Sequence, residues 1–96
     1  MGYKVTLFDG TDDPSDSSSS DVAWMGGHGV CKCTADTWAG TLVLESITDS
    51  GSWIEVGTNT VSENGEFTFD ASMGRLRATV VGSLTNAGCT VERVRR

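Results

Sequence analysis

One histidine and three cysteines are the residues whose types and spacing come nearest to a metal site. His28, Cys31 and Cys33 form a His-x-x-Cys-x-Cys run, and Cys89 follows much later. In a strand, Cys31 and Cys33 would point to one face, about 6.6 Å apart along the chain. Zinc needs roughly four tetrahedral ligands, usually including cysteines spaced two to four residues apart in a knuckle. We therefore expect no zinc here and expect the cysteines to pack as small apolar side chains, with a disulfide from Cys89 to Cys31 or Cys33 as the minority alternative.

A run of aspartates near the start of the chain offers oxygen ligands for calcium. Asp9, Asp12, Asp13 and Asp16 lie within a Ser-rich stretch. Their spacing does not match the EF-hand loop, which requires its glycine and its bidentate glutamate. The composition instead predicts an exposed acidic loop over residues 9–21, because such a stretch cannot bury apolar surface.

Residues for covalent or acid–base catalysis are sparse. His28 is the sole histidine, and no Gly-x-Ser-x-Gly elbow is present. Glu45 and Glu55 are lone carboxylates on expected strands, whereas glycoside hydrolysis needs two facing carboxyl groups. A phosphate-binding loop is also missing from the sequence. We therefore expect no catalytic residues, no cofactor and no enzymatic activity.

Three tryptophans, Trp24, Trp38 and Trp53, are candidates for stacking on sugars, with burial in a core or an interface as the alternative. We retain Trp38 and Trp53 as candidate exposed aromatics.

The formal net charge is −6 at pH 7, and basic residues interleaved with aromatics are missing. An acidic chain of this kind has no general attraction to nucleic acid, so we expect no nucleic-acid partner.

Charge is spread unevenly along the chain. Residues 75–96 contain five arginines and one acidic residue, Glu92, whereas the preceding two-thirds is acidic. Planar guanidinium groups favour bidentate contacts with carboxylates, so a basic end suits an acidic protein partner. A frayed tail without consequence is the alternative. The candidate docking residues are Arg93, Arg95 and Arg96 at the basic end and Asp9, Asp12 and Asp13 in the acidic stretch.

Alternation of apolar and polar residues predicts the fold class. Phe67 and Phe69, like Leu76, Ala78 and Val80, alternate with polar neighbours, which places each set on a core face. Turn signals, including Asp-Ser-Gly at 49–51 and Asn-Gly at 64–65, separate these runs. We expect strands at residues 3–8, 22–25, 30–34, 41–47, 52–56, 60–62, 67–70, 75–81 and 89–95. The pattern predicts one all-β domain over residues 1–96, an antiparallel sandwich or jelly-roll-like barrel of about seven to nine short strands.

Targeting signals are not apparent in the sequence. Residues 3–8 are too short and too polar for the apolar region of a signal peptide, and no apolar run approaches membrane-spanning length. Three cysteines do not form a closed disulfide framework. We therefore expect synthesis in a reducing cytoplasm and no membrane partner.

Three segments resemble a known family. They are WAGTLVLE at 38–45, DSGSWIEVG at 49–57, and GRLRA at 74–78 with Gly82. Together they resemble small β-sandwich virion proteins of tailed bacteriophages, in which a strand pair with W-x-G-T and D-G-x-W motifs precedes an F-x-x-x-x-G-x-h-R-h strand, where h is apolar. The resemblance covers roughly residues 38–94. Members of this family decorate or cement the phage head, or form part of a head fibre or collar.

The resemblance implies a structural role. The first hypothesis is a decoration or cement protein on the outer capsid surface of the virion, which bridges neighbouring subunits of the major capsid protein. Self-association, including a trimer, is compatible with that role. The second is a head-fibre, collar or tail adhesion domain that binds host glycan or protein, and the third is a carbohydrate-binding module of a non-viral assembly. Copy number per particle separates the first two.

Overall fold

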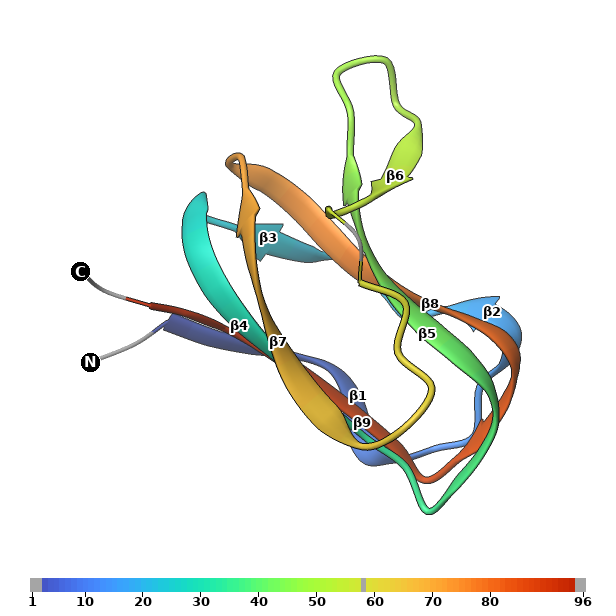
Figure 1. Ribbon diagram of the computed structural model, residues 1–96. Coiled ribbons are helices and arrows are strands. Elements are labelled where there is room, and N and C mark those ends of the chain that lie inside the picture. The colour runs from blue at the N-terminus through green and yellow to red at the C-terminus, as the bar shows by residue number, and fades with distance from the viewer. Residues whose placement is uncertain (1–2, 58, 95–96) are drawn as a thin grey trace.

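The computed structural model describes residues 3–57 and 59–94, and within these ranges the chain contains strands and no helix. Nine strands form two antiparallel sheets that pack as a sandwich (Figure 1). The expected all-β sandwich is therefore confirmed. Over the same ranges, no helix has the length and apolar character needed to cross a bilayer.

Sheet A has the strand order β1-β9-β4-β7. Its strands are β1 (Tyr3–Asp12), β9 (Ala87–Arg93), β4 (Gly27–Thr34) and β7 (Gly65–Ala71). Sheet B has the order β2-β8-β5-β6, with β3 also paired to β8. Its strands are β2 (Ser15–Ser18), β8 (Gly74–Thr85), β5 (Thr37–Ile47), β6 (Trp53–Glu55) and β3 (Val22–Trp24).

The core lies between the two sheets. In β8 the even positions point inward, and Leu76, Ala78 and Val80 are at most 1% exposed. From sheet A, Phe69 in β7 is buried and Phe67 is half-buried against the same cluster. Period-two alternation therefore identified the core face of both strands.

Two glycines allow the long strands β5 and β8 to approach closely. Gly40 lies directly opposite Gly82 in the register, and Gly82 has a φ of +87°. A Cβ on Gly82 would lie 2.6 Å from the Ala39 carbonyl oxygen, and one on Gly40 would collide with the Val81 carbonyl oxygen. Only glycine fits this crossing without displacing the backbone.

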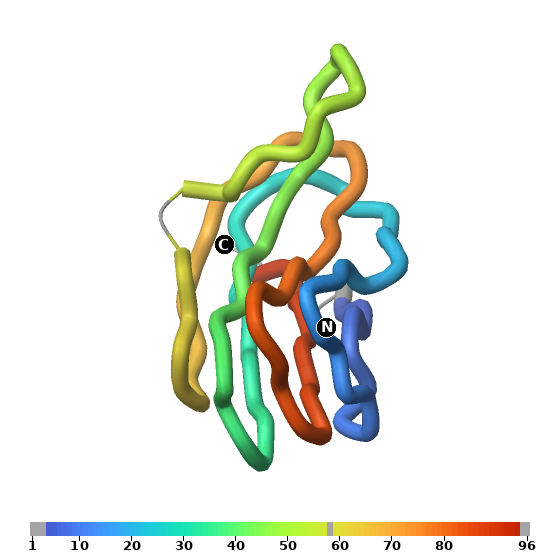
Figure 2. The backbone as a smooth tube through the Cα atoms, turned by 90° about the vertical axis from the view of Figure 1, so that its right-hand side faces the viewer, coloured from blue at the N-terminus to red at the C-terminus, as the bar shows by residue number. Residues whose placement is uncertain are grey.

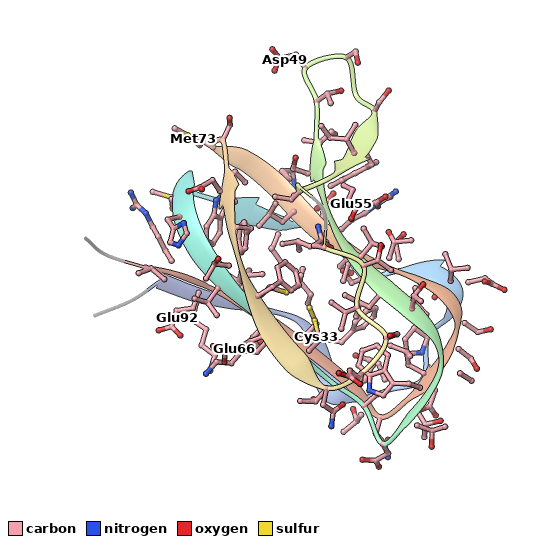
Figure 3. The ribbon with its side chains drawn as sticks, viewed as in Figure 1. Cys33, Asp49, Glu55, Glu66, Met73 and Glu92 are labelled. Carbon is pink, nitrogen blue, oxygen red and sulfur yellow. The ribbon has the colours of Figure 1, made fainter. Side chains whose placement is uncertain are left out.

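The hairpin of β5 and β6 projects beyond the rest of the sandwich (Figures 1 and 2). Asp49 lies at its tip (Figure 3). The turn closes with the Thr48 amide donating to the Ser52 carbonyl at 2.7 Å, and Gly51 has a φ of +90°. The sequence placed a turn at residues 49–51, and the hairpin confirms it.

Only part of the stretch 9–21 is a loop, so that expectation is wrong in part. Residues up to Asp12 belong to β1, and β2 pairs with β8 through Ser17 opposite Val80. The Pro14 carbonyl also accepts a hydrogen bond from the Leu84 amide at 3.1 Å. Backbone pairing needs no apolar side chains, and the side chains of β2 stay exposed. Composition therefore predicted exposure but not strand pairing.

The strands expected at 52–56 and 60–62 are reduced in the structure. Residues 60–62 form only an isolated bridge, in which Val61 pairs with Leu42. The strand expected at 52–56 is reduced to β6. The adjoining segment is held instead by Asn59, which is 6% exposed and hydrogen-bonded to the backbone of β5.

Candidate functional site

Three strands of sheet B bring a charged and aromatic cluster together on the outer face of the sandwich. Glu45 in β5 lies directly opposite Arg77 in β8, and the Arg77 Nε donates to the Glu45 Oε1 at 2.9 Å. Thr79 Oγ1 donates to the same oxygen at 2.6 Å. The Arg77 Cζ lies over the ring of Trp53 from β6, 4.3 Å from its centroid. We call Glu45, Trp53, Arg77 and Thr79 the Arg77 cluster.

Strand alternation explains this placement. Even residues of β8 enter the core, so Arg77 and Thr79 must point outward from sheet B. Burial of the ion pair is partial, with side-chain exposures of 28% for Arg77 and 19% for Glu45. The next outward residue, Arg75, makes a more exposed ion pair with Asp21 at 2.8 Å. The outer face of sheet B is here a polar surface whose charges are paired with one another, and the Arg77 guanidinium covers one face of the Trp53 ring.

The carboxylates weighed for catalysis are engaged in hydrogen bonds within the fold. Glu55 lies directly opposite Glu45 in the β5–β6 pair. Its Oε2 accepts a 2.6 Å hydrogen bond from the Asn59 amide, while Glu45 is held by Arg77.

Neither candidate aromatic is fully exposed. Trp38 is half-buried, packs against the core, and donates from its indole Nε1 to the Asn64 Oδ1 at 2.7 Å. Trp53 is half-buried beneath the Arg77 guanidinium. Trp24 is 1% exposed and lies 5.2 Å from Phe69 between ring centroids. Trp53 is therefore the tryptophan that belongs to an outer polar surface.

The aspartates selected for docking gather at one end of the sandwich. The Asp9 Oδ1 accepts hydrogen bonds from the Thr11 hydroxyl at 2.7 Å and the Thr11 amide at 2.9 Å, and these bonds lower the pKa of Asp9. The Asn86 amide donates to the Asp13 Oδ1 at 2.9 Å, and the Asn86 side chain donates to Asp36. The carboxylates of these three aspartates and of Asp12 are exposed. We call this group the acidic end: Asp9, Asp12, Asp13 and Asp36.

Arg93 lies at the opposite end of the β1–β9 pair. It is opposite Tyr3 at the start of β1, whereas Asp12 is opposite Ala87. The two sets of candidate docking residues are therefore held apart by the length of the strand pair. Arg95 and Arg96 lie outside the described residues.

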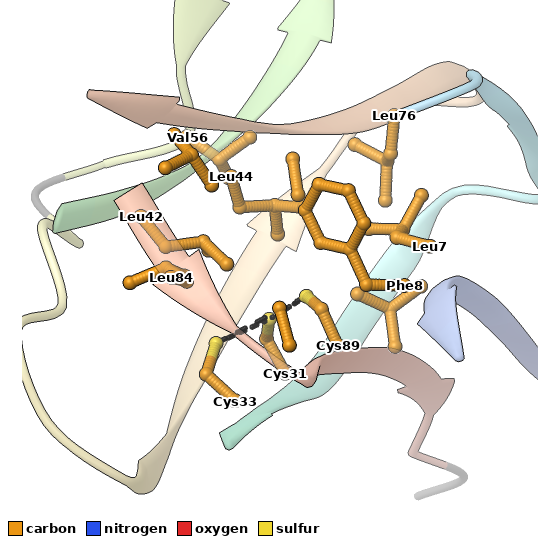
Figure 4. Close-up of a cluster of buried hydrophobic side chains, with 14 of the residues drawn as sticks. Leu7, Phe8, Cys31, Cys33, Leu42, Leu44, Val56, Leu76, Leu84 and Cys89 are labelled. Atoms are coloured by element: carbon orange, nitrogen blue, oxygen red, sulfur yellow. Dashed lines mark hydrogen bonds between the residues drawn. The ribbon is translucent and has the colours of Figure 1, made fainter. Parts of the chain in front are cut away.

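The three cysteines meet in the core, from β4 and β9 (Figure 4). The Sγ–Sγ distances are 3.7 Å for Cys31–Cys33, 3.6 Å for Cys31–Cys89 and 4.0 Å for Cys33–Cys89. All three are 0% exposed free thiols. The hydrogen bonds with Cys31 and Cys89 lower the pKa of the Cys33 thiol, and the hydrogen bond with Cys33 raises the pKa of the Cys31 thiol.

His28 does not join the cysteines. It is an even residue of β4, so it points away from the core face that holds Cys31 and Cys33. Its Nδ1 lies 3.0 Å from the Asp70 Oδ1 on the outer side of sheet A. The four residues considered for zinc are therefore not assembled as one set, and the expected lack of zinc remains a prediction.

Comparison with known proteins identifies the fold alone. No protein-family model matches the chain, and no curated protein matches it in sequence. The SPBc2 prophage-derived protein YomS aligns over 96% of this chain and 95% of its own, with 12% identity and a TM-score of 0.59. The Yersinia pseudotuberculosis-derived mitogen aligns over 99% and 85%, with 11% identity and a TM-score of 0.52. The solved structures that share this sandwich thus include a prophage-derived protein.

Proposed function

We propose that this chain is a structural virion protein of a tailed bacteriophage, which decorates and cements the capsid by bridging neighbouring subunits of the major capsid protein. The resemblance of residues 38–94 to phage virion sandwiches supports the proposal. A fold shared with a prophage-derived protein agrees with it.

The Arg77 cluster is the observation that supports the proposal most. The three resembling segments each contribute one residue to it: Glu45 from WAGTLVLE, Trp53 from DSGSWIEVG and Arg77 from GRLRA. Segments selected only by their sequence pattern therefore form one continuous part of sheet B. Three segments can form one structural unit of a family only if they lie together in the fold, as these segments do.

Bridging requires contacts at separated places on one small body. The sandwich has principal extents of 33 × 32 × 20 Å, and its acidic end and Arg93 lie at opposite ends of the β1–β9 pair. Each end would touch a different neighbour in the shell. Weak contacts repeated in this way add avidity that no single contact supplies.

A head-fibre, collar or tail adhesion domain is the second candidate. The observation that favours it is the half-buried Trp53 beside the hydrogen-bonding groups of Arg77 and Glu45. An aromatic ring beside charged donors and acceptors is suited to a sugar ring or a host protein. In this case Trp53→Ala would abolish binding of the protein to host cells while leaving capsid stability unchanged.

A reconstitution experiment tests the first proposal against the second. Particles made without the gene are mixed with purified protein, and the bound protein and the temperature of genome release are measured. Cementing predicts saturable binding at shell sites and a higher release temperature. Binding confined to the tail or collar, with an unchanged release temperature, would refute it.

A further inference from the structure

The side chains of the three cysteines lean toward one another more than ordinary strand geometry requires. Cys31 and Cys33 are two positions apart on one strand, which separates their Cα atoms by about 6.6 Å. Their sulfurs are 3.7 Å apart, and Cys89 approaches both from the neighbouring strand β9. All the cysteines of the chain thus point to one place inside the sandwich (Figure 4).

The sulfur triangle has the dimensions of a metal site. A triangle with sides of 3.6, 3.7 and 4.0 Å has its centre about 2.2 Å from each sulfur, close to the usual metal–thiolate bond of about 2.3 Å. An ion at this point would lie in the plane of the three sulfurs. At the usual bond length the ion would lie about 0.7 Å out of this plane. The distances therefore fit three thiolate ligands, and the surroundings decide whether a fourth ligand is present.

The surroundings restrict which ion fits. Among the described residues no His, Asp or Glu joins the three thiols as a fourth ligand. The adjoining core side chains are apolar and include Phe8, Leu42 and Leu84, so they offer no partners to a metal-bound water (Figure 4). Structural zinc almost always takes four ligands, whereas soft thiolates also select Cu(I). An ion satisfied by three sulfurs is the one that suits these apolar surroundings.

We propose that Cys31, Cys33 and Cys89 form a three-coordinate Cu(I) site that links β4 to β9 at the centre of sheet A. Copper enters and remains as Cu(I), so the step needs no oxidant or reductant. The thiol protons that the metal displaces pass to solvent. Because the bound ion joins two strands of the folded state, copper stabilises that state. The inference does not depend on the proposed virion role.

The direct test is an anaerobic titration of the reduced, full-length chain with Cu(I) against a chromophoric Cu(I) chelator. We expect one copper per chain after desalting, a raised melting temperature, and an X-ray absorption spectrum with three sulfurs near the bond length above. Retention of no copper against the chelator would overturn the proposal. So would a spectrum with two sulfurs, a preference for zinc over Cu(I), or a disulfide among the three residues in protein purified without air.

Two variants make the test specific. Cys33→Ala should fold and lose stoichiometric copper, whereas His28→Ala, the matched control on the outer side of the same strand, should bind as the wild type does. Equal copper retention by Cys33→Ala would overturn the proposal. Should Cys33→Ala fail to fold, the spectrum of the wild-type chain decides alone.

Discussion

The guanidinium of Arg77 lies over the indole of Trp53, 4.3 Å from the ring centroid, and so joins the base of the projecting hairpin to β8. The same guanidinium binds Glu45, which gives one side chain contacts with both β5 and β6. A cation over an aromatic ring contributes about 0.5–1 kcal/mol at exposed sites and about 2 kcal/mol when desolvated. This side chain therefore helps to fix the hairpin on the sandwich.

Replacing Arg77 by Ala should lower the free energy of unfolding by about 1–2 kcal/mol, because both the ion pair and the ring contact are lost. Arg75→Ala is the matched control, since Arg75 makes one exposed ion pair from the same strand face. We expect the control to cost less than about 1 kcal/mol. Urea denaturation of both variants measures the difference, and equal losses would show that the ring contact contributes nothing.

Gly40→Ala should destabilise the chain by about 1–3 kcal/mol or more, because its methyl group would collide with the backbone of β8. Gly65→Ala is the control: its position in β7 has no atom within 4 Å of an added Cβ. That variant should stay within about 0.5 kcal/mol of the wild type. Thermal unfolding followed by circular dichroism compares the two, and an unaffected Gly40→Ala would contradict the close crossing of β5 and β8.

Phe69→Ala should cost about 3–5 kcal/mol, because Phe69 is 5% exposed and packs on Trp24. Phe67→Ala should cost clearly less, because Phe67 is only half-buried. Chemical denaturation of the two variants tests the ranking. A Phe69→Ala transition that barely moves would show that this face is not the core.

Sequence reasoning succeeded where the signal was local. Alternation around Phe69 and Leu76 gave the core face, and a glycine turn gave the projecting hairpin. The same alternation would have shown that His28 and Cys31 point to opposite sides of β4.

Contacts between distant segments could not be predicted. The pairing of β2 with β8 depends on backbone hydrogen bonds that serine and aspartate do not signal. An asparagine in a sequence indicates a turn at most. The Asn59 Oδ1 nevertheless accepts from the Leu44 amide, and its Nδ2 donates to the Val56 carbonyl. The Arg77 cluster likewise requires three strands in register, which one sequence does not reveal.

Truncation at the basic end tests the docking proposal. Deleting residues 94–96 removes Arg95 and Arg96, and Arg93→Ala removes the neighbouring charge on β9. Both changes should weaken attachment to particles at low salt, and the difference from wild type should shrink at high salt because exposed charges are screened. Arg75→Ala, which removes an equal charge from β8 in the other sheet, should attach normally. Wild-type occupancy of both altered proteins at low salt would mean that the end of the chain has no part in docking.

Capsid cementing is tested most directly by the copy number of the chain in purified virions. Quantitative mass spectrometry measures this number relative to the copy number of the major capsid protein. A decorating and cementing protein should be present in hundreds of copies per particle, in a simple ratio to the capsid subunit. A dozen or so copies, or recovery only with the tail, would contradict capsid cementing and favour the fibre, collar or adhesion role.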